Sequence, residues 1–143
     1  MTASAAGLVV DASVSLAWFF EDEATEFTEQ ILDEIARTPA WVPSLWILES
    51  ANVLATAERR RRISRLQRRR LVEQAMRLPV FVDREPVSVD TIDGLCETHG
   101  LSAYDAAYLE LAMRRSLTLV TLDGELVAAA RAAGHPFSTS AAR

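Results

Sequence analysis

Lysine is absent from this 143-residue chain, so all fifteen basic residues are arginines and mechanisms that need a lysine side chain are excluded. The single cysteine, Cys96, cannot form an intramolecular disulfide, and we predict a small core residue at the end of a helix. No window of about 18 residues lacks a charge, which favours a soluble globular protein. The first apolar run is interrupted by Asp11 and follows no basic segment, which argues against a signal peptide and favours the cytoplasm.

Nucleotide-binding loops are also missing, since the sequence contains neither a GK[ST] nor a GxGxxG motif. The length suits one domain, over residues 1–143, that can bury a core without disulfides. The formal net charge is −5, but the charges are separated along the chain. Nine arginines fall between Arg59 and Arg77, and seven acids fall between Glu21 and Glu34, which predicts an electrically two-sided molecule.

Apolar runs and helically spaced apolar residues alternate along the chain. Strands are expected at residues 7–10, 40–42, 80–82 and 117–122, with a further edge strand at 136–139. Helices are expected at residues 13–20, 25–37, 43–62, 64–78, 86–99, 102–115 and 125–133. This alternation predicts an α/β fold, a three-layer α/β/α sandwich with a central parallel sheet.

Two carboxylates follow the two clearest predicted strands. Asp11 comes directly after "LVV", and Asp123 follows "LTLVTL". In a parallel sheet both side chains emerge at the same edge, and they are neighbours if the two strands are neighbours. The alternative for Asp123 is a turn residue, because Asp-Gly is a common turn pair.

Glu49 and Asp105 are acids on predicted helices. The helix with Glu49 is apolar on nearly every side, and Glu49, Asn52 and Thr56 form a narrow polar stripe that should face a polar cavity. The alternative is an ordinary exposed face with Glu49 in water. Asp105 ends Ser102-x-x-Asp105, which has the form of a capping box, so helix capping is the alternative to a functional role.

Four carboxylates gathered in one cleft would repel one another, and a divalent cation removes that conflict. Oxygen ligands without His or Cys partners favour Mg²⁺ or Mn²⁺ over Zn²⁺. One or two such ions can make a water nucleophilic and stabilise the leaving oxygen in phosphodiester cleavage. We therefore predict that the acids Asp11, Glu49, Asp105 and Asp123 are catalytic ligands of Mg²⁺ or Mn²⁺.

Four motifs, in chain order and across nearly the whole sequence, resemble the PIN domain family: "VVDASV", "LESANVL", "LSAYDAAYLELA" and "LVTLDGEL". The short length is similar to VapC-type toxins of toxin–antitoxin pairs. The resemblance implies a Mg²⁺- or Mn²⁺-dependent ribonuclease that uses the same four acids, with Ser13 and Thr121 as lesser hydroxyl contributors. It also implies an RNA substrate, a homodimer, and inhibition by a cognate antitoxin whose tail enters the cleft.

Two other classes of protein require a residue that this sequence lacks. A phosphoacceptor receiver domain relies on a lysine near its last strand, and the chain has none. A haloacid-dehalogenase-like phosphatase would have a second Asp two places after the first, where Ser13 stands. A catalytically inactive PIN-fold binding or scaffold protein stays open, and such a protein need not bind metal.

The segment "RRRRISRLQRRR", residues 59–70, admits two interpretations. Arginine-rich surfaces neutralise phosphates and could guide RNA towards the acids. On this interpretation the RNA-binding residues are Arg60, Arg61, Arg69 and Arg70. The alternative is a solvated helix pair, or one that contacts an acidic stretch such as "EDEATEFTE" in another subunit.

Overall fold

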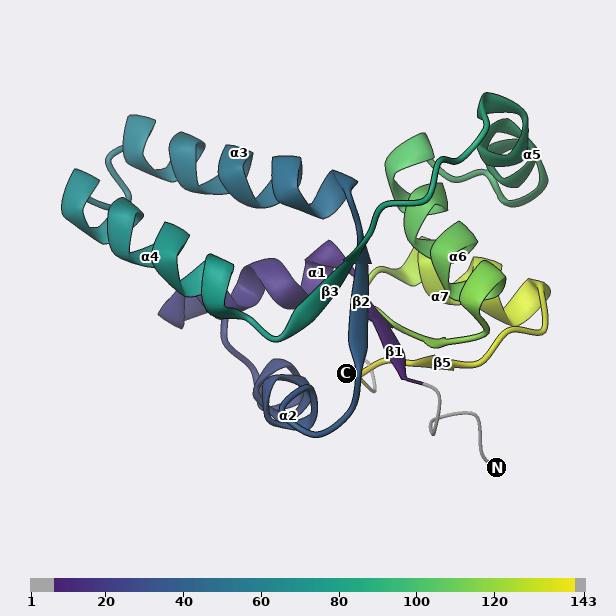
Figure 1. The fold of residues 1–143 in the computed structure, drawn as a ribbon, viewed down its shortest axis with the longest axis horizontal. Coiled ribbons are helices and arrows are strands. Elements are labelled where there is room, and N and C mark those ends of the chain that lie inside the picture. The colour runs from purple at the N-terminus through teal and green to yellow at the C-terminus, as the bar shows by residue number, and fades with distance from the viewer. Residues whose placement is uncertain (1–6, 141–143) are drawn as a thin grey trace.

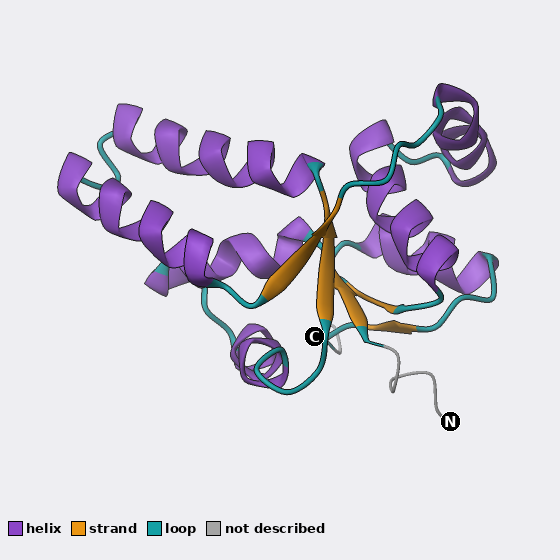
Figure 2. Ribbon diagram, viewed as in Figure 1, coloured by secondary structure: helices purple, strands orange, loops and turns teal. Residues whose placement is uncertain are grey.

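The computed structural model describes residues 7–140, in which five short strands form one sheet between layers of helices (Figures 1 and 2). The strands are β1 (Leu8–Val10), β2 (Ala40–Pro43), β3 (Val80–Asp83), β4 (Thr118–Val120) and β5 (Phe137–Ser138). Their order is β3-β2-β1-β4-β5, and every neighbouring pair is parallel. The predicted α/β sandwich with a central parallel sheet is confirmed.

The helices follow the order expected from the sequence. They are α1 (Ala12–Ser15), α2 (Glu26–Glu34), α3 (Leu45–Arg59), α4 (Arg65–Arg77), α5 (Val89–His99), α6 (Ala103–Arg115) and α7 (Gly124–Ala132), with 3₁₀ turns η2 (Leu16–Phe19) and η3 (Glu21–Glu23). The helix expected over 86–99 begins later because Ser88 caps it, its Oγ accepting a hydrogen bond from Thr91 N at 3.1 Å. No helix in residues 7–140 has the length and apolarity needed to cross a lipid bilayer.

Strand β1 is buried on both faces, which explains its continuous apolar run. Side chains alternate along a strand, so Val9 packs with Leu109 of α6 on one face. Leu8 and Val10 pack with Ile31 of α2 on the other face. The strand therefore lies in the middle of the molecule, and the residue that follows it leaves the core at the sheet edge.

Gly7 fixes where β1 begins. Its φ is +124°, and a Cβ at this position would lie 2.6 Å from the carbonyl oxygen of Pro39. Only glycine has both the conformational freedom and the small size for this approach. The close contact lets Leu8 N donate a hydrogen bond to that same Pro39 oxygen at 2.8 Å, which starts the pairing of β1 with β2.

The strand order creates a topological switch point between β1 and β4. The chain builds the sheet outward from β1 through β2 to β3, and it then returns to the other side of β1 to form β4 and β5. In open α/β sheets, ligands bind at the carboxyl ends of the strands beside such a point. In Figure 1 the α3–α4 hairpin extends to the left of the sheet, whereas α5, α6 and α7 lie to its right.

Candidate metal centre

Asp11 lies at the carboxyl end of β1 and caps the first turn of α1. Its Oδ2 accepts hydrogen bonds from Ser13 N at 3.3 Å, Ser13 Oγ at 2.7 Å and Thr121 Oγ1 at 2.9 Å. The residue is 3% exposed. Burial raises the pKa of Asp11, and the hydrogen bonds from Ser13 and Thr121 oppose that rise. The side chain is thus both desolvated and held in one orientation.

Thr121 joins the ends of the two central strands. Its fully buried hydroxyl donates to Asp11 Oδ2 and accepts a hydrogen bond from Asp123 N at 2.9 Å. The Ser13 hydroxyl makes a second link, since it accepts a hydrogen bond from Leu122 N at 2.9 Å. Both hydroxyl residues singled out in the sequence therefore contact Asp11 and bind the segment after β4 to the segment after β1.

Asp123 begins α7, and its Oδ1 accepts hydrogen bonds from Glu125 N at 2.8 Å and Leu126 N at 3.1 Å. It therefore caps this helix, and it also joins a carboxylate cluster. Asp105, Asp123 and Glu125 each offer an oxygen atom that lies within 4.8 Å of the other two. Glu125 was missed by the sequence reasoning, although its position in the first turn after "DG" was a signal that could have found it.

Asp105 lies in the first turn of α6, which Ser102 caps by accepting a hydrogen bond from Asp105 N at 3.1 Å. Burial, followed by the negative charges of Asp123, Asp11 and Glu125, raises the pKa of Asp105 to about 6. The repulsion expected between clustered acids is therefore present at Asp105. A cation or a proton at this point relieves it.

Glu49 approaches the same acids from α3. It is half-buried, and the hydroxyl of Tyr108 on α6 donates a hydrogen bond of 2.5 Å to its Oε1. Burial raises the pKa of Glu49, the hydrogen bond from Tyr108 opposes the rise, and the charges of Asp11 and Asp105 add to it. Glu49 is therefore electrostatically coupled to two of the other predicted acids.

The apolar composition of α3 predicts a helix buried on nearly every side, and this predicted burial is wrong. Trp46 and Leu54 face the core, but Ile47 is 41% exposed and Leu48 is 69% exposed, because only one stripe of this helix packs against the body of the protein. An open hollow of about 540 Å³ is lined by Leu45, Leu48, Glu49, Asn52 and Tyr104. Glu49 therefore borders the carboxylates on one side and a largely apolar hollow on the other.

All four predicted acids lie beside the switch point between β1 and β4, at the carboxyl edge of the sheet. Asp105 and Asp123 belong, with Glu125, to the group of carboxylates within 4.8 Å of one another, whereas Asp11 and Glu49 lie outside that group but interact with Asp105 through their charges. The four acids come from four separate elements: Asp11 from the end of β1, Glu49 from α3, Asp105 from α6 and Asp123 from the start of α7. The donor atoms are carboxylate oxygens, and hydroxyl groups hydrogen-bond to the carboxylate of Asp11. Such a hard-oxygen donor set fits Mg²⁺ or Mn²⁺.

Of the arginines predicted to bind RNA, Arg60 and Arg61 lie in the turn that joins α3 to α4 at the free end of this hairpin (Figure 1), and Arg69 and Arg70 lie in the second turn of α4. We call them the tip arginines: Arg60, Arg61, Arg69 and Arg70. All four are exposed. From Glu49 to Arg60 the distance along the helix axis is roughly 16 Å at 1.5 Å per residue. The tip arginines are therefore not part of the carboxylate cluster.

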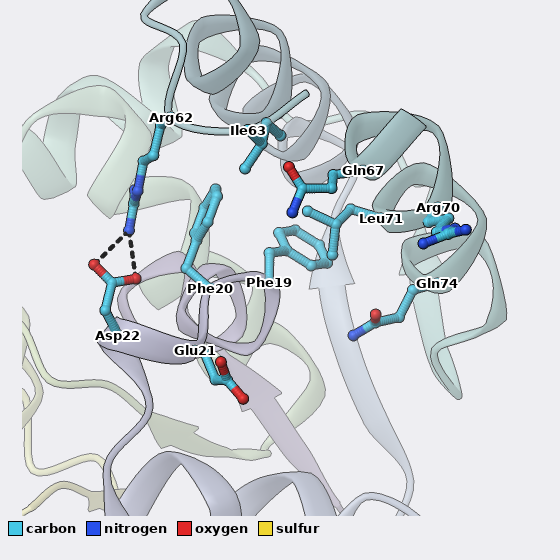
Figure 3. Close-up of a pocket in the computed structure, with 10 residues that line it drawn as sticks. All are labelled: Phe19, Phe20, Glu21, Asp22, Arg62, Ile63, Gln67, Arg70, Leu71 and Gln74. Carbon is cyan, nitrogen blue, oxygen red and sulfur yellow. Dashed lines mark hydrogen bonds and ion pairs between the residues drawn. The ribbon is translucent and has the colours of Figure 1, made fainter. Parts of the chain in front are cut away.

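Other arginines of the same segment form ion pairs within the chain. Arg62 pairs with Asp22 at 2.8 Å, as Figure 3 shows, and with Glu23 at 2.9 Å, and its guanidinium lies 3.9 Å from the centre of the Phe20 ring. The arginine-rich segment, residues 59–70, therefore contacts the acidic stretch "EDEATEFTE" of the same chain. The alternative given in the sequence analysis placed this contact between two subunits. Arg62 and Arg70 border a groove of about 600 Å³ that also has Phe19, Phe20 and Leu71 in its lining (Figure 3).

A further buried acid at a strand end, Asp83, was also missed by the sequence reasoning. It ends β3, is 4% exposed, and forms ion pairs with Arg114 at 2.8 Å and Arg115 at 2.9 Å. The hydrogen bonds from Arg114, and then those from Arg115, hold the pKa of Asp83 below its usual range. Asp83 is neutralised by protein cations and does not join the candidate metal centre.

The protein has an all-parallel sheet and a cluster of carboxylates at the switch point of that sheet. These two features place it among α/β proteins with a candidate site for a divalent metal ion. Within that class, the PIN domain model matches residues 8–132, and the chain belongs to the PIN domain family. The match spans all four acids. No curated protein matches the chain closely enough to count as a relative.

Solved structures show the same fold. PAE2754 from Pyrobaculum aerophilum is 24% identical over 92% of this chain and 90% of its own, with a TM-score of 0.68. VapBC2 from Rickettsia felis, bound to a DNA fragment from its promoter, is 12% identical over 94% and 98%, with a TM-score of 0.66. VapC20 from Mycobacterium tuberculosis, a toxin that cleaves the sarcin–ricin loop, is 18% identical over 86% and 95%, with a TM-score of 0.59.

Proposed function

We propose that this chain is a VapC-type toxin, a Mg²⁺- or Mn²⁺-dependent endoribonuclease that cleaves RNA phosphodiester bonds. The observation that carries the proposal is the convergence of carboxylates at the β1–β4 switch point, where oxygens of Asp105, Asp123 and Glu125 lie within 4.8 Å of one another. Membership of the PIN domain family supports it. The similarity in fold to VapC20, a toxin that cleaves the sarcin–ricin loop, supports the choice of RNA as substrate.

The four acids Asp11, Glu49, Asp105 and Asp123 would hold the ion or ions. Glu125 is a further candidate ligand, since its carboxylate oxygen lies within 4.8 Å of those of Asp105 and Asp123. When bound, Mg²⁺ or Mn²⁺ supplies a polarised water nucleophile and stabilises charge on the leaving oxygen. Three hydrogen bonds converge on one oxygen of Asp11 and fix its orientation before any ligand arrives. The chain itself therefore contributes a preorganised set of negative charges.

A negatively charged centre repels RNA phosphates, so binding needs a positive surface elsewhere on the molecule. We propose that the tip arginines provide it. All four are exposed, whereas Arg62 and Arg68 of the same segment are held in ion pairs with acids of this chain. The separation between the tip and the acids suits a substrate that is longer than a few nucleotides.

We propose two protein partners, a cognate antitoxin and a second copy of the chain. The resemblance to VapC-type toxins of toxin–antitoxin pairs implies an antitoxin partner. The fold shared with FitAcB from Neisseria gonorrhoeae and VapBC2 from Rickettsia felis supports this choice. The groove in Figure 3, with aromatic and charged lining residues, suits an amphipathic segment of that partner. The exposed apolar residues Ile47 and Leu48 of α3 suit a dimer contact.

The decisive experiment is incubation of purified protein with total RNA, with Mn²⁺ or with chelator, followed by mapping of the cut ends. We expect metal-dependent cuts that leave 5′-phosphate and 3′-hydroxyl ends, because no RNA 2′-hydroxyl takes part in attack by water. The Asp105→Asn variant should lose the cuts, and the control Asp93→Asn, which changes an exposed acid on α5, should keep them. Ends carrying 2′,3′-cyclic phosphate would overturn the mechanism. Absence of both cleavage and Mn²⁺ binding would favour an inactive scaffold.

A further inference from the structure

Tyr108 is the largest fully buried side chain of the described residues, and it carries a hydroxyl group at the border of the candidate metal centre. Tyr108 as a whole is 1% exposed. The hydroxyl, on α6, donates a hydrogen bond of 2.5 Å to Oε1 of Glu49 on α3. Glu49 lies 59 positions earlier in the chain. The burial of its ring among core residues such as Leu109 and Leu111 leaves this hydroxyl little freedom to move.

The same helix carries Asp105 one turn before Tyr108. The hydrogen bond therefore ties Glu49 to the helix that presents another predicted ligand. Burial raises the pKa of Tyr108, the hydrogen bond to Glu49 raises it further, and the negative charges of Glu49, Asp11 and Asp105 add to the rise. Glu49 itself is only half-buried and borders an open hollow, so without this bond its long side chain would sample several rotamers.

We propose that Tyr108 is a positioning residue that holds the Glu49 carboxylate in the orientation needed to bind a divalent cation. The inference rests on the proposed function, because it assigns Tyr108 a role in that same centre. One carboxylate oxygen, Oε1, accepts the hydroxyl hydrogen, and this contact fixes the direction of the whole group. Groups that orient metal ligands in this way contribute strongly to metal affinity.

The chain offers a matched control. Tyr104 lies on the same helix, one turn earlier, but it is 65% exposed. Tyr108→Phe and Tyr104→Phe each remove one hydroxyl and keep the ring. Because the ring of Tyr108 supplies its core packing, the Tyr108→Phe variant should fold, and its melting temperature in chelator checks this.

The test is calorimetric titration of the metal-free proteins with Mn²⁺, without any RNA. Tyr108→Phe should weaken Mn²⁺ binding by roughly tenfold, whereas Tyr104→Phe should bind as the wild type does. Glu49→Gln should also weaken binding. In the double variant that carries Glu49→Gln and Tyr108→Phe, the second change should not weaken Mn²⁺ binding further. A residue that acts through the Glu49 carboxylate has nothing to position once that carboxylate is gone.

The outcomes separate this inference from the proposed function. If Glu49→Gln weakens binding and Tyr108→Phe does not, Tyr108 only satisfies a buried hydroxyl and the inference fails, while the metal centre stands. Equal additional losses from Tyr108→Phe in the presence and absence of Glu49 would likewise assign it a general structural role. If Glu49→Gln and Asp105→Asn both bind Mn²⁺ like the wild type, the metal centre of the proposed function fails as well.

Discussion

Replacing Asp105 with Asn should stabilise the metal-free protein at neutral pH. In the wild type, the ionised carboxylate of Asp105 is partly buried and faces the negative charges of Asp123, Asp11 and Glu125. A pKa raised from the ordinary value of 3.8 to about 6 corresponds to about 3 kcal/mol if the group were shielded from water. Asp105 is only partly buried, so screening by solvent reduces the expected gain to about 1 kcal/mol.

The stability gained by Asp105→Asn should depend on pH, because only the ionised form of Asp105 destabilises the folded protein. Because the folded protein binds the proton on Asp105 more tightly than the unfolded chain does, the penalty is absent below pH 3.8. It grows as the pH rises, and it is fully present above about pH 6. The advantage of Asp105→Asn should therefore appear at pH 7.5 and vanish near pH 3.5.

Thermal melts in chelator measure the effect. For a chain of this length we expect the melting temperature of Asp105→Asn to be higher by about 3 °C at pH 7.5. The exposed control Asp93→Asn should show no such gain. Saturating Mn²⁺ should reverse the order, because a cation bound to the folded state stabilises the wild type more than the variant. A variant that is less stable than the wild type in chelator at pH 7.5 would refute the reasoning from charge repulsion.

Three further predictions test other parts of the molecule. Replacing Thr121 with Val removes the hydroxyl between Asp11 and Asp123, and urea melts should show a loss of about 1–2 kcal/mol together with weaker Mn²⁺ binding. Asp83→Asn should cost about 3 kcal/mol at pH 7 in the same melts and leave Mn²⁺ affinity unchanged. Because the pKa of Asp83 is lowered, its stabilisation is complete above the ordinary value of 3.8 and is lost as the pH falls below it. Changing the tip arginines to Gln should flatten the salt dependence of RNA binding in fluorescence anisotropy, and an unchanged slope would exclude them as phosphate contacts.

The sheet and the position of the acids could be predicted because their signals are local. An apolar run that ends in a carboxylate, as at Asp11, predicts a buried strand whose end reaches the edge of the sheet. The neighbouring positions of β1 and β4 then bring the segments after these strands together through Thr121. The first turn after "DG" marks Glu125 as a candidate, but the distance of its carboxylate from Asp105 depends on the angle at which α7 leaves the sheet.

The exposure of α3 could not be predicted, because its composition is apolar on several sides. Which side faces the core depends on the position of its tertiary neighbours, and these cover Leu54 but leave Leu48 open. The link from Tyr108 to Glu49 is similarly a tertiary property. The sequence shows two tyrosines one turn apart on α6, and only the tertiary structure, in which Tyr108 joins the core between α6 and the sheet, decides that Tyr108 is buried and Tyr104 is exposed.

Asp11 and Asp83 have a similar local sequence pattern, a short apolar strand segment followed by a buried aspartate, yet their electrostatic surroundings are opposite. The difference comes from α6, which presents Asp105 in its first turn to the switch point and Arg114 in its last turn to Asp83. Protein cations therefore neutralise the acid on β3, whereas among the described residues no ion pair reaches the four acids of the candidate centre. A buried carboxylate that the chain leaves without a cation of its own favours one from solution, which is why the metal is expected at Asp11 and not at Asp83.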